Sequence, residues 1–518
     1  MAHPAGYYCA PSRVARRELE RRLELALGAR ASGGARLQRT WYDTPDWRLY
    51  RAGWLLEHDI RGARGELRLR RLGKPEPDLT AFAALPPQAG TNPATGPLRD
   101  ALAAHCGRRA LVPYARANVN SRGLEVVNAE GKTTVRLAVE SSTRLDPQLR
   151  AGRRLAPVVR LSPLRGYQAE AIGARAALAD LGLVPAASDP MLAALDDSSR
   201  RPLDYSPHPR VPVGADEPPA AAVARLLRAY FAVMQCNVEG IRTDLDTECL
   251  HDFRTAMRRS RTLLAAFGVV AASRRAPFRS GFSWLSAVTG ALRDLDVFIE
   301  AVGTWTAPAP ASARADAQRL ERWLRERRAR ALEDVRTALA SARWQAFAAA
   351  WGGFIDRLER GEGIARRAAP TLRQAARDAL ARVLEPVLER GGAIEDGSPV
   401  AELHELRKDA KKLRYLLEAV ALLCRPREHA AVIALLKGLQ DNLGDLCDLE
   451  TQRRILGEQI EAMCREPAPG PGPGVIRLAQ DIQATLAGRA VRPRQRFAAN
   501  YARFSRPKSI RRLRRLLR

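Results

Sequence analysis

The spacing of apolar and polar residues divides the chain into two parts. In the N-terminal part, residues 66–70 and 133–139 alternate polar with apolar side chains, as strands with one buried face do. Helical patterns intervene at 14–28 and 168–181. Farther along the chain, long Ala-, Leu- and Arg-rich segments carry apolar residues at the spacing of amphipathic helices instead. The pattern predicts a two-domain protein, an α+β domain followed by an all-helical one.

Proline-rich sequence marks the expected boundary between these domains. Residues 206–220 contain five prolines and are predicted to be a linker. The α+β domain is then expected at 1–205 and the helical domain at 221–505. Residues 506–518 form a basic amphipathic tail, which we expect to be solvated rather than bound to anionic lipid.

Two stretches of the helical part follow one template. Each has a histidine, an arginine three residues on, a basic pair at seven and eight, and an arginine at ten. On a helix the histidine, the first arginine, the first member of the pair and the last arginine share a stripe about 80° wide. The second member of each pair lies outside that stripe. Both stretches are therefore predicted to be helices with an apolar back and a cationic front.

A second motif repeats at almost the same interval. The motif Gly-x-x-x-Asp-Leu has its aspartate at Asp294 in the first copy and at Asp448 in the second, and each copy follows one of the basic stretches along the chain. The interval is much longer than the 20 to 50 residues of a solenoid repeat. It favours a duplicated four-helix bundle, with repeats at about 221–345 and 370–465.

Charge restricts the class of partner. The formal net charge is +28 and the isoelectric point is near 10.9, which implies a polyanion such as nucleic acid, anionic membrane or polyphosphate. The seven cysteines are scattered singly without a Cys-x-x-Cys pair, so neither a zinc site nor a disulfide framework is predicted. No apolar run is long enough to span a bilayer. We therefore expect a cytoplasmic protein without metal or cofactor.

The pair of basic stretches, together with the Asp-Leu motifs, resembles the CHAD domain, an α-helical domain named for its histidines. The resemblance covers about 221–505. It implies two four-helix bundles related by approximate two-fold symmetry, whose facing basic helices bind inorganic polyphosphate. Carried over position by position, the polyphosphate-binding residues are His251, Arg254, Arg258, Arg259, Arg261, His404, Arg407, Lys411, Lys412 and Arg414.

The N-terminal part resembles the CYTH family of triphosphate tunnel β-barrels. The resemblance rests on residues 42–53 and on the basic strand at 66–70. The family opens on a Glu-x-Glu-x-Lys strand, which this chain lacks. Where a later strand of the family carries two glutamates, this chain has Arg160 and Ser162. The resemblance implies an antiparallel tunnel-type barrel.

Catalysis by this domain is not expected. Hydrolysis of a triphosphate there needs carboxylates that hold a divalent metal against the phosphates. Asp43, Glu140 and Glu170 remain only as isolated acids, each expected to be structural. Arg68 and Arg70 are kept as possible phosphate contacts.

The basic stripes suit polyphosphate, which offers a line of negative charges and no base edges. A helix presents one cation per turn, about 5.4 Å apart, and arginine adds bidentate contacts to phosphate oxygens. Lys408 and Lys437 are possible further contacts. Because a polyanion favours charged histidine, binding is expected to tighten as the pH falls through about 6.5. The function predicted is a polyphosphate-binding protein, associated with polyphosphate granules.

Two alternatives remain at this point. A nucleic-acid-binding protein could use the same cations, although the stripes lack the interleaved aromatic residues on which bases stack. A triphosphate hydrolase is possible if the N-terminal domain retains activity.

Overall fold

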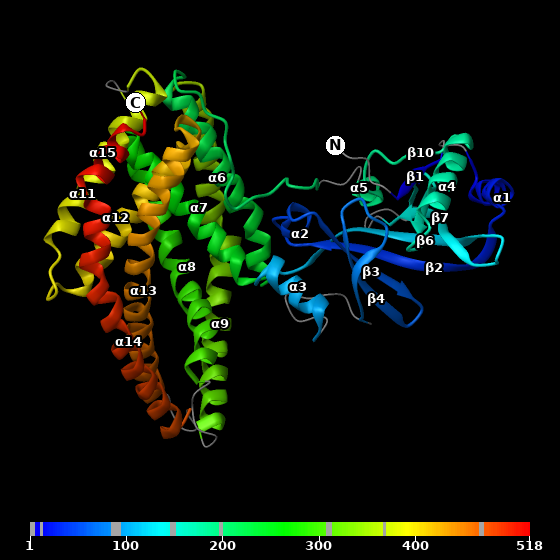
Figure 1. Cartoon of the computed structure of the whole chain (residues 1–518). Helices are drawn as coiled ribbons and strands as arrows, with labels where there is room; N and C mark the ends of the chain where they lie inside the picture. Colours follow the sequence, from blue (N-terminus) through cyan, green and yellow to red (C-terminus); the bar gives the residue numbers. More distant parts are fainter. Residues whose placement is uncertain are drawn as a thin grey trace. The chain divides into compact units, whose positions relative to one another are not determined.

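The chain folds into two compact units. A computed structural model describes residues 6–10, 14–83, 95–145, 152–195, 200–306, 313–365, 369–465 and 471–517. The first unit, Met1–Ser206, is built on a β-sheet, and the second, Pro207–Arg518, is helical (Figure 1). The predicted succession of an α+β domain and an all-helical domain is confirmed.

The sheet of the first unit is antiparallel and curled into a half-barrel (Figure 1). Its strand order is β10-β1-β9-β7-β6-β2-β3-β4-β5, and β8 pairs with β7. The strands are β1 (Tyr7–Cys9), β2 (Arg30–Asp43), β3 (Trp54–Arg61), β4 (Arg64–Arg71), β5 (Pro77–Phe82), β6 (Val112–Val127), β7 (Thr133–Arg144), β8 (Arg153–Arg154), β9 (Val158–Pro163) and β10 (Val184–Pro185).

Helices cover the sheet with apolar side chains. Leu23 of α1 (Arg16–Leu27) and Leu178 of α4 (Gln168–Asp180) are buried with Leu137 of β7 in one core. The other helices of this unit are α2 (Arg48–Arg51), α3 (Pro97–Cys106) and α5 (Pro190–Leu195). Asp43 accepts hydrogen bonds from the backbone N–H groups of Thr44, Leu49 and Tyr50, at 2.7, 3.0 and 2.8 Å. It therefore has the structural role expected of it, which is to hold the turn into α2.

The described part of the second unit contains two successive sets of five helices. The basic motif lies on the second helix of each set and the Asp-Leu motif on the third. The first set is α6 (Pro219–Arg242), α7 (Thr247–Ala266), α8 (Ala272–Thr306), α9 (Arg314–Ala340) and α10 (Ala342–Glu359). The second set is α11 (Leu372–Ala393), α12 (Val400–Ala419), α13 (Pro426–Arg465), α14 (Pro473–Ser505) and α15 (Pro507–Arg515), with a 3₁₀ turn, η2 (Ala421–Leu423), after α12.

Each set exceeds the expected four helices by one, and the second set extends beyond the expected limit of residue 465. The long helices form two antiparallel pairs, α8 with α9 and α13 with α14 (Figure 1). The described segments of the expected linker lie against the helical unit. The N–H groups of Leu372 and Arg373, at the start of α11, donate to the carbonyls of Glu217 and Ala215, both at 2.9 Å. This segment therefore packs against the helices instead of forming a flexible connection.

The C-terminal tail is part of the helical fold. Leu513, Leu516 and Leu517 are buried, and the tail contacts α11, α13 and α14. Arg511 and Arg512 face solvent. The apolar side that could have entered a lipid surface is thus covered by the protein itself. No helix in the described ranges has both the length and the apolar character needed to cross a membrane.

Candidate functional site

The two basic motifs lie on neighbouring helices, α7 and α12. Both helices form because apolar residues recur on one face. Phe253 and Met257 of α7 are buried, as are Leu406 and Leu413 of α12. The side chain of Asp246 caps α7 by accepting a hydrogen bond from the N–H of Cys249 at 2.9 Å. Burial of the apolar faces leaves the cationic faces of the two helices accessible.

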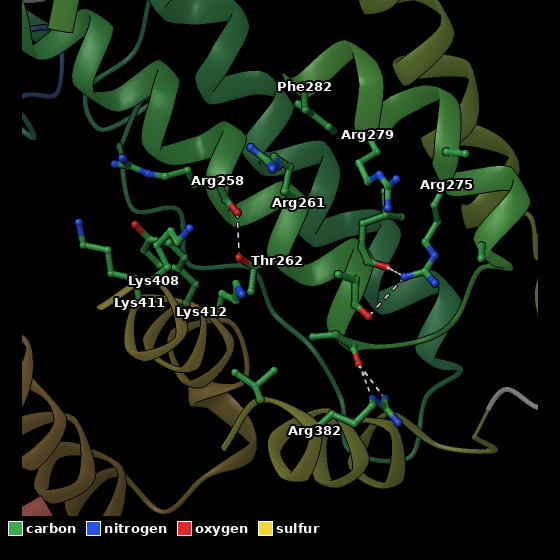
Figure 2. A pocket seen from close by; sticks show the side chains of 17 residues that line it. Arg258, Arg261, Thr262, Arg275, Arg279, Phe282, Arg382, Lys408, Lys411 and Lys412 are labelled. Atoms are coloured by element: carbon green, nitrogen blue, oxygen red, sulfur yellow. Dashed lines mark hydrogen bonds between the residues drawn. The ribbon is translucent and has the colours of Figure 1, made fainter. Parts of the chain in front are cut away.

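A cavity of about 770 Å³ lies where α7, α8, α11 and α12 meet, and we refer to it as the cationic cavity. In Figure 2 the three lysines project from α12 on one side and two arginines from α8 on the other, with two arginines of α7 between them. No acidic residue lines it among the described residues. Its cationic lining consists of Arg258, Arg261, Arg275, Arg279, Arg382, Lys408, Lys411 and Lys412.

Five of the residues predicted from the sequence are therefore brought together: Arg258, Arg261, Lys408, Lys411 and Lys412. That they bind a ligand stays a prediction. The other predicted residues of this unit lie outside the lining of the cavity. They are His251, Arg254, Arg259, His404, Arg407, Arg414 and Lys437.

Arg259 is not placed to contact a ligand in the cavity. It is buried, and its Nη2 lies 2.6 Å from a carboxylate oxygen of Glu418 on α12. The guanidinium also lies over the rings of Tyr230 and Tyr415, with centroids at 5.7 and 5.6 Å. Arg414 reaches the same carboxylate at 3.4 Å. Arg259 therefore links the two halves of the helical unit, and its predicted contact with a ligand stays a prediction.

Arg254 and Arg407 stand at equivalent positions and face the aspartates of the second motif. Arg407 forms an ion pair with Asp448 at 2.8 Å. Burial and then the neighbouring Arg258 lower the pKa of Arg254 to about 10, whereas Asp294 acts in the opposite direction. Arg254 donates to the backbone carbonyl of Ser286 at 3.1 Å and also contacts Thr289. Asp448 thus holds Arg407 by an ion pair, whereas Ser286 and Thr289 hold Arg254 and Asp294 acts on it only as a neighbouring charge.

The two histidines occupy the first position of each motif. His404 is exposed, and partial burial together with Lys408 and Arg407 lowers its pKa below the usual 6.5. In the free protein, His404 therefore becomes protonated at a lower pH than the sequence predicts. His251 is half-buried.

Lys411 carries the largest perturbation of any cation in the cavity. Burial lowers its pKa to about 8, and Arg407 and Arg258 add to the effect, while Asp448 opposes it. The group is therefore mostly charged at pH 7 and loses its proton as the pH rises through about 8. An anion in the cavity would favour the charged form.

Three cations of the cavity were not predicted: Arg275, Arg279 and Arg382. Arg275 donates to the carbonyls of Leu264 and Ala265 at 3.3 and 3.5 Å, and Arg382 donates to the carbonyl of Ala266 at 2.7 Å (Figure 2). These are last-turn carbonyls of α7, which lack intrahelical partners and carry the negative end of the helix dipole. The arginines therefore cover a negative helix end that would otherwise face an anion.

Several arginine donors near the cavity lack an acceptor. The Nε atoms of Arg254, Arg258 and Arg407 are buried and have no hydrogen-bond partner among the described residues. An unpaired buried donor costs roughly 1–3 kcal/mol. Phosphate oxygens can accept from such groups.

Two aromatic residues also line the cavity, contrary to the absence of aromatics from the stripes. Phe282 has 0% and Tyr415 4% of its surface exposed. Rings so deeply buried are not open platforms on which a base could stack.

Buried arginines of the first unit form ion pairs with carboxylates of the same unit. Arg70, 1% exposed, donates to Glu57 at 2.8 Å and to both carboxylate oxygens of Asp189 at 2.6 and 2.9 Å. Arg68 donates to Asp59 at 3.2 Å. Internal carboxylates therefore hold the guanidinium groups of Arg68 and Arg70, and that these residues contact a phosphate stays a prediction.

The same network of buried arginines and carboxylates includes Arg39 of β2. Arg39 donates to both oxygens of Asp59 at 2.7 and 2.8 Å and to Glu140 at 3.4 Å. Glu140 lies 3.8 Å from Arg160. Although burial alone would raise it, Arg39 and neighbouring arginines hold the pKa of Glu57 well below its usual value. No cluster of three potential metal ligands occurs among the described residues.

Comparisons with known proteins agree with this division. Residues 225–457 match the model of the CHAD domain family. The crystal structure of the CHAD domain from the plant Ricinus communis is similar, with 22% identity and a TM-score of 0.47, over 57% of this chain and 95% of that chain. PptA from Streptomyces chartreusis is similar with 19% identity and a TM-score of 0.41, over 55% of this chain and 99% of that chain. None of the curated proteins compared with this chain matches it. The curled antiparallel sheet of the first unit fits a CYTH-like domain.

Proposed function

Since residues 225–457 are a CHAD domain, we propose that this protein binds inorganic polyphosphate through the cationic cavity and the adjoining faces of α7 and α12. One observation carries the proposal: eight lysine and arginine side chains converge on one cavity whose described lining contains no acid. Most other arginines of the helical unit with printed contacts pair with carboxylates, as Arg328 does with Asp244 and Asp296. Two of the eight pair with acids outside the lining, Lys408 with Glu405 at 2.5 Å and Lys412 with Asp409 at 2.7 Å. The other six have no ion pair with a carboxylate among the described residues, so the cavity retains a positive charge.

Arg261 of α7 and Lys412 of α12 are exposed, so the cationic lining is open to solvent on both helices. A flexible chain of phosphates can follow this lining, whereas duplex DNA presents its phosphates on a rigid cylinder. The burial of both aromatic rings of the lining likewise supports a ligand without bases.

The first test is isothermal titration of the full chain with long-chain polyphosphate, and with single-stranded and duplex DNA of equal charge. We choose about 0.3 M salt because it suppresses non-specific attraction. The variant Arg258→Ala/Lys411→Ala removes two cations of the cavity. The control Arg477→Ala/Arg489→Ala removes two exposed cations from α14.

We expect polyphosphate to bind more tightly than either DNA. The cavity variant should lose at least tenfold in affinity and the control less than threefold. Equal loss in both variants would mean that the cavity is generic positive surface. Tighter binding of DNA would replace the proposal with a nucleic-acid function.

We also propose that the first unit does not hydrolyse triphosphate, because its basic strand is engaged by internal carboxylates. The protein then acts as a binding protein in the cytoplasm, at polyphosphate granules. Co-sedimentation of the full chain with isolated granules, and its loss in Arg258→Ala/Lys411→Ala, is the measurement that checks this placement.

A further inference from the structure

The cationic cavity has an apolar floor that inorganic polyphosphate does not require. Besides its eight cations and Thr262, the cavity is lined by eight apolar or largely apolar side chains. They come from the end of α7, the start of α8, and single positions on α11 and α12. Ala265, Ala272 and Ala276 of this floor are exposed, while Phe282 lies buried beneath it.

A chain of bare phosphates cannot use this floor. A phosphate oxygen placed over alanine side chains loses its water and gains no hydrogen bond in return. Polyphosphate would therefore follow the cations at the rim and leave the floor uncovered. The volume of about 770 Å³ lies within the range of pockets that enclose small organic ligands.

The cations are placed for a ligand with a charged end and an apolar end. Lys408, Lys411 and Lys412 line one side from α12 (Figure 2), and the alanines of the floor belong to α7 and α8. On the far side, Arg275 is held by carbonyls of α7. Arg279 forms no hydrogen bond or ion pair among the described residues. The α12 side of the cavity thus offers the ammonium group of Lys411 together with those of Lys408 and Lys412, which also pair with Glu405 and Asp409. The region beside it offers apolar surface.

We infer that the cationic cavity binds a di- or triphosphate esterified to an apolar group, with the phosphates on the α12 lysines and Arg258 and the apolar group on the alanine floor. The inference rests on the proposed function in that the same cations hold both ligands. It adds a class of small organic ligand that polyphosphate binding alone does not predict. Isoprenoid diphosphates carry a hydrocarbon chain at this place, and nucleotides carry a nucleoside, of which only the flat face of the base is apolar.

The test compares each ester with its inorganic counterpart on the full chain by isothermal titration in EDTA. Adenosine triphosphate is compared with tripolyphosphate, and geranyl diphosphate with pyrophosphate. At least one ester should bind tenfold or more tightly than its counterpart, and the ester that does so identifies the source. Its binding should also show the more negative heat-capacity change, because apolar surface is buried.

The variant Ala265→Gln/Ala276→Gln makes the floor polar and keeps every cation. We expect it to abolish the preference for the ester while the affinity for the inorganic anion stays within threefold. The control Ala484→Gln/Ala487→Gln, at exposed positions of α14, should keep the preference. If both esters bind no more tightly than their counterparts and show the same heat-capacity change, the inference is wrong.

Long-chain polyphosphate is titrated into the same variants. Retained polyphosphate binding without any ester preference would overturn this inference and leave the proposed function standing. An ester preference without polyphosphate binding would overturn the proposed function and support this inference.

Discussion

Lys411 connects the charge of the cavity to pH. In the free protein its pKa is about 8 instead of 10.5, because the group is buried beside Arg407 and Arg258. A bound polyanion favours the charged ammonium and raises that pKa. Binding must therefore be accompanied by proton uptake wherever Lys411 is neutral in the free protein.

We predict that the full chain takes up protons when polyphosphate binds at pH 8.5, and that affinity falls as the pH rises from about 8 toward 10.5. Titration in two buffers of different ionisation enthalpy measures the uptake. Lys411→Arg keeps the charge at all these pH values and should remove most of the uptake. Equal uptake in the two proteins would contradict the assignment to Lys411.

Arg259 shows what the sequence could and could not predict for single residues. Its angle around α7 already placed it outside the basic stripe, and burial against Glu418 follows from that angle. Its counterpart Lys412 has the same angle on α12 but is exposed and lines the cavity. The difference depends on what packs against each helix, which a repeat in the sequence cannot reveal.

At the scale of elements, α7 and α12 are joined by the ion pair of Arg259 with Glu418. We predict that Arg259→Ala lowers the free energy of unfolding by about 1–3 kcal/mol, because a buried guanidinium packed on Tyr230 and Tyr415 is lost. Glu418 is partly exposed and keeps Arg414 as a partner. Polyphosphate affinity should change less than threefold. Chemical denaturation of the full chain, monitored by the circular dichroism of its helices, measures the free energy of unfolding. Isothermal titration calorimetry measures the affinity for polyphosphate.

Lys412→Ala is the matched control from the second repeat. It should change the free energy of unfolding by less than about 1 kcal/mol, since the side chain is exposed and its partner Asp409 keeps Arg390 at 3.0 Å, yet weaken polyphosphate binding. If instead Arg259→Ala weakens binding and leaves stability unchanged, Arg259 contacts the ligand after all.

The helices themselves were largely predictable, because apolar residues at helical spacing identify α7 and α12. The arrangement of the cavity was not. Arg275 and Arg382 belong to segments without a motif, and they reach the cavity only because α8 and α11 meet the end of α7. The apolar floor arises from the same meeting of helix ends, for which a single sequence has no periodic signal.

At the scale of the whole molecule, the two units treat their cations differently. The first unit pairs Arg39, Arg68 and Arg70 with buried acids, whereas the helical unit leaves a group of cations open. The strands of the first unit were predictable from alternation. The pairing was not, because Asp189 approaches Arg70 from a distant part of the chain.

We predict that the full chain releases no phosphate from tripolyphosphate in the presence of Mg²⁺ or Mn²⁺, because the carboxylates that would hold metal are occupied by arginines. A phosphate-release assay with an active triphosphatase as positive control measures this. Metal-dependent release that Glu57→Gln abolishes would assign catalysis to the first unit.

The cationic cavity draws four cations from each half of the helical unit: Arg258, Arg261, Arg275 and Arg279 from the first, and Arg382, Lys408, Lys411 and Lys412 from the second. Neither half contains a complete site. A polypeptide cut in the loop between α10 and α11 should therefore behave as two complementary subunits, inactive when separate and competent when mixed. Its affinity for a ligand would then depend on protein concentration, with one ligand-binding cavity for each reassembled pair.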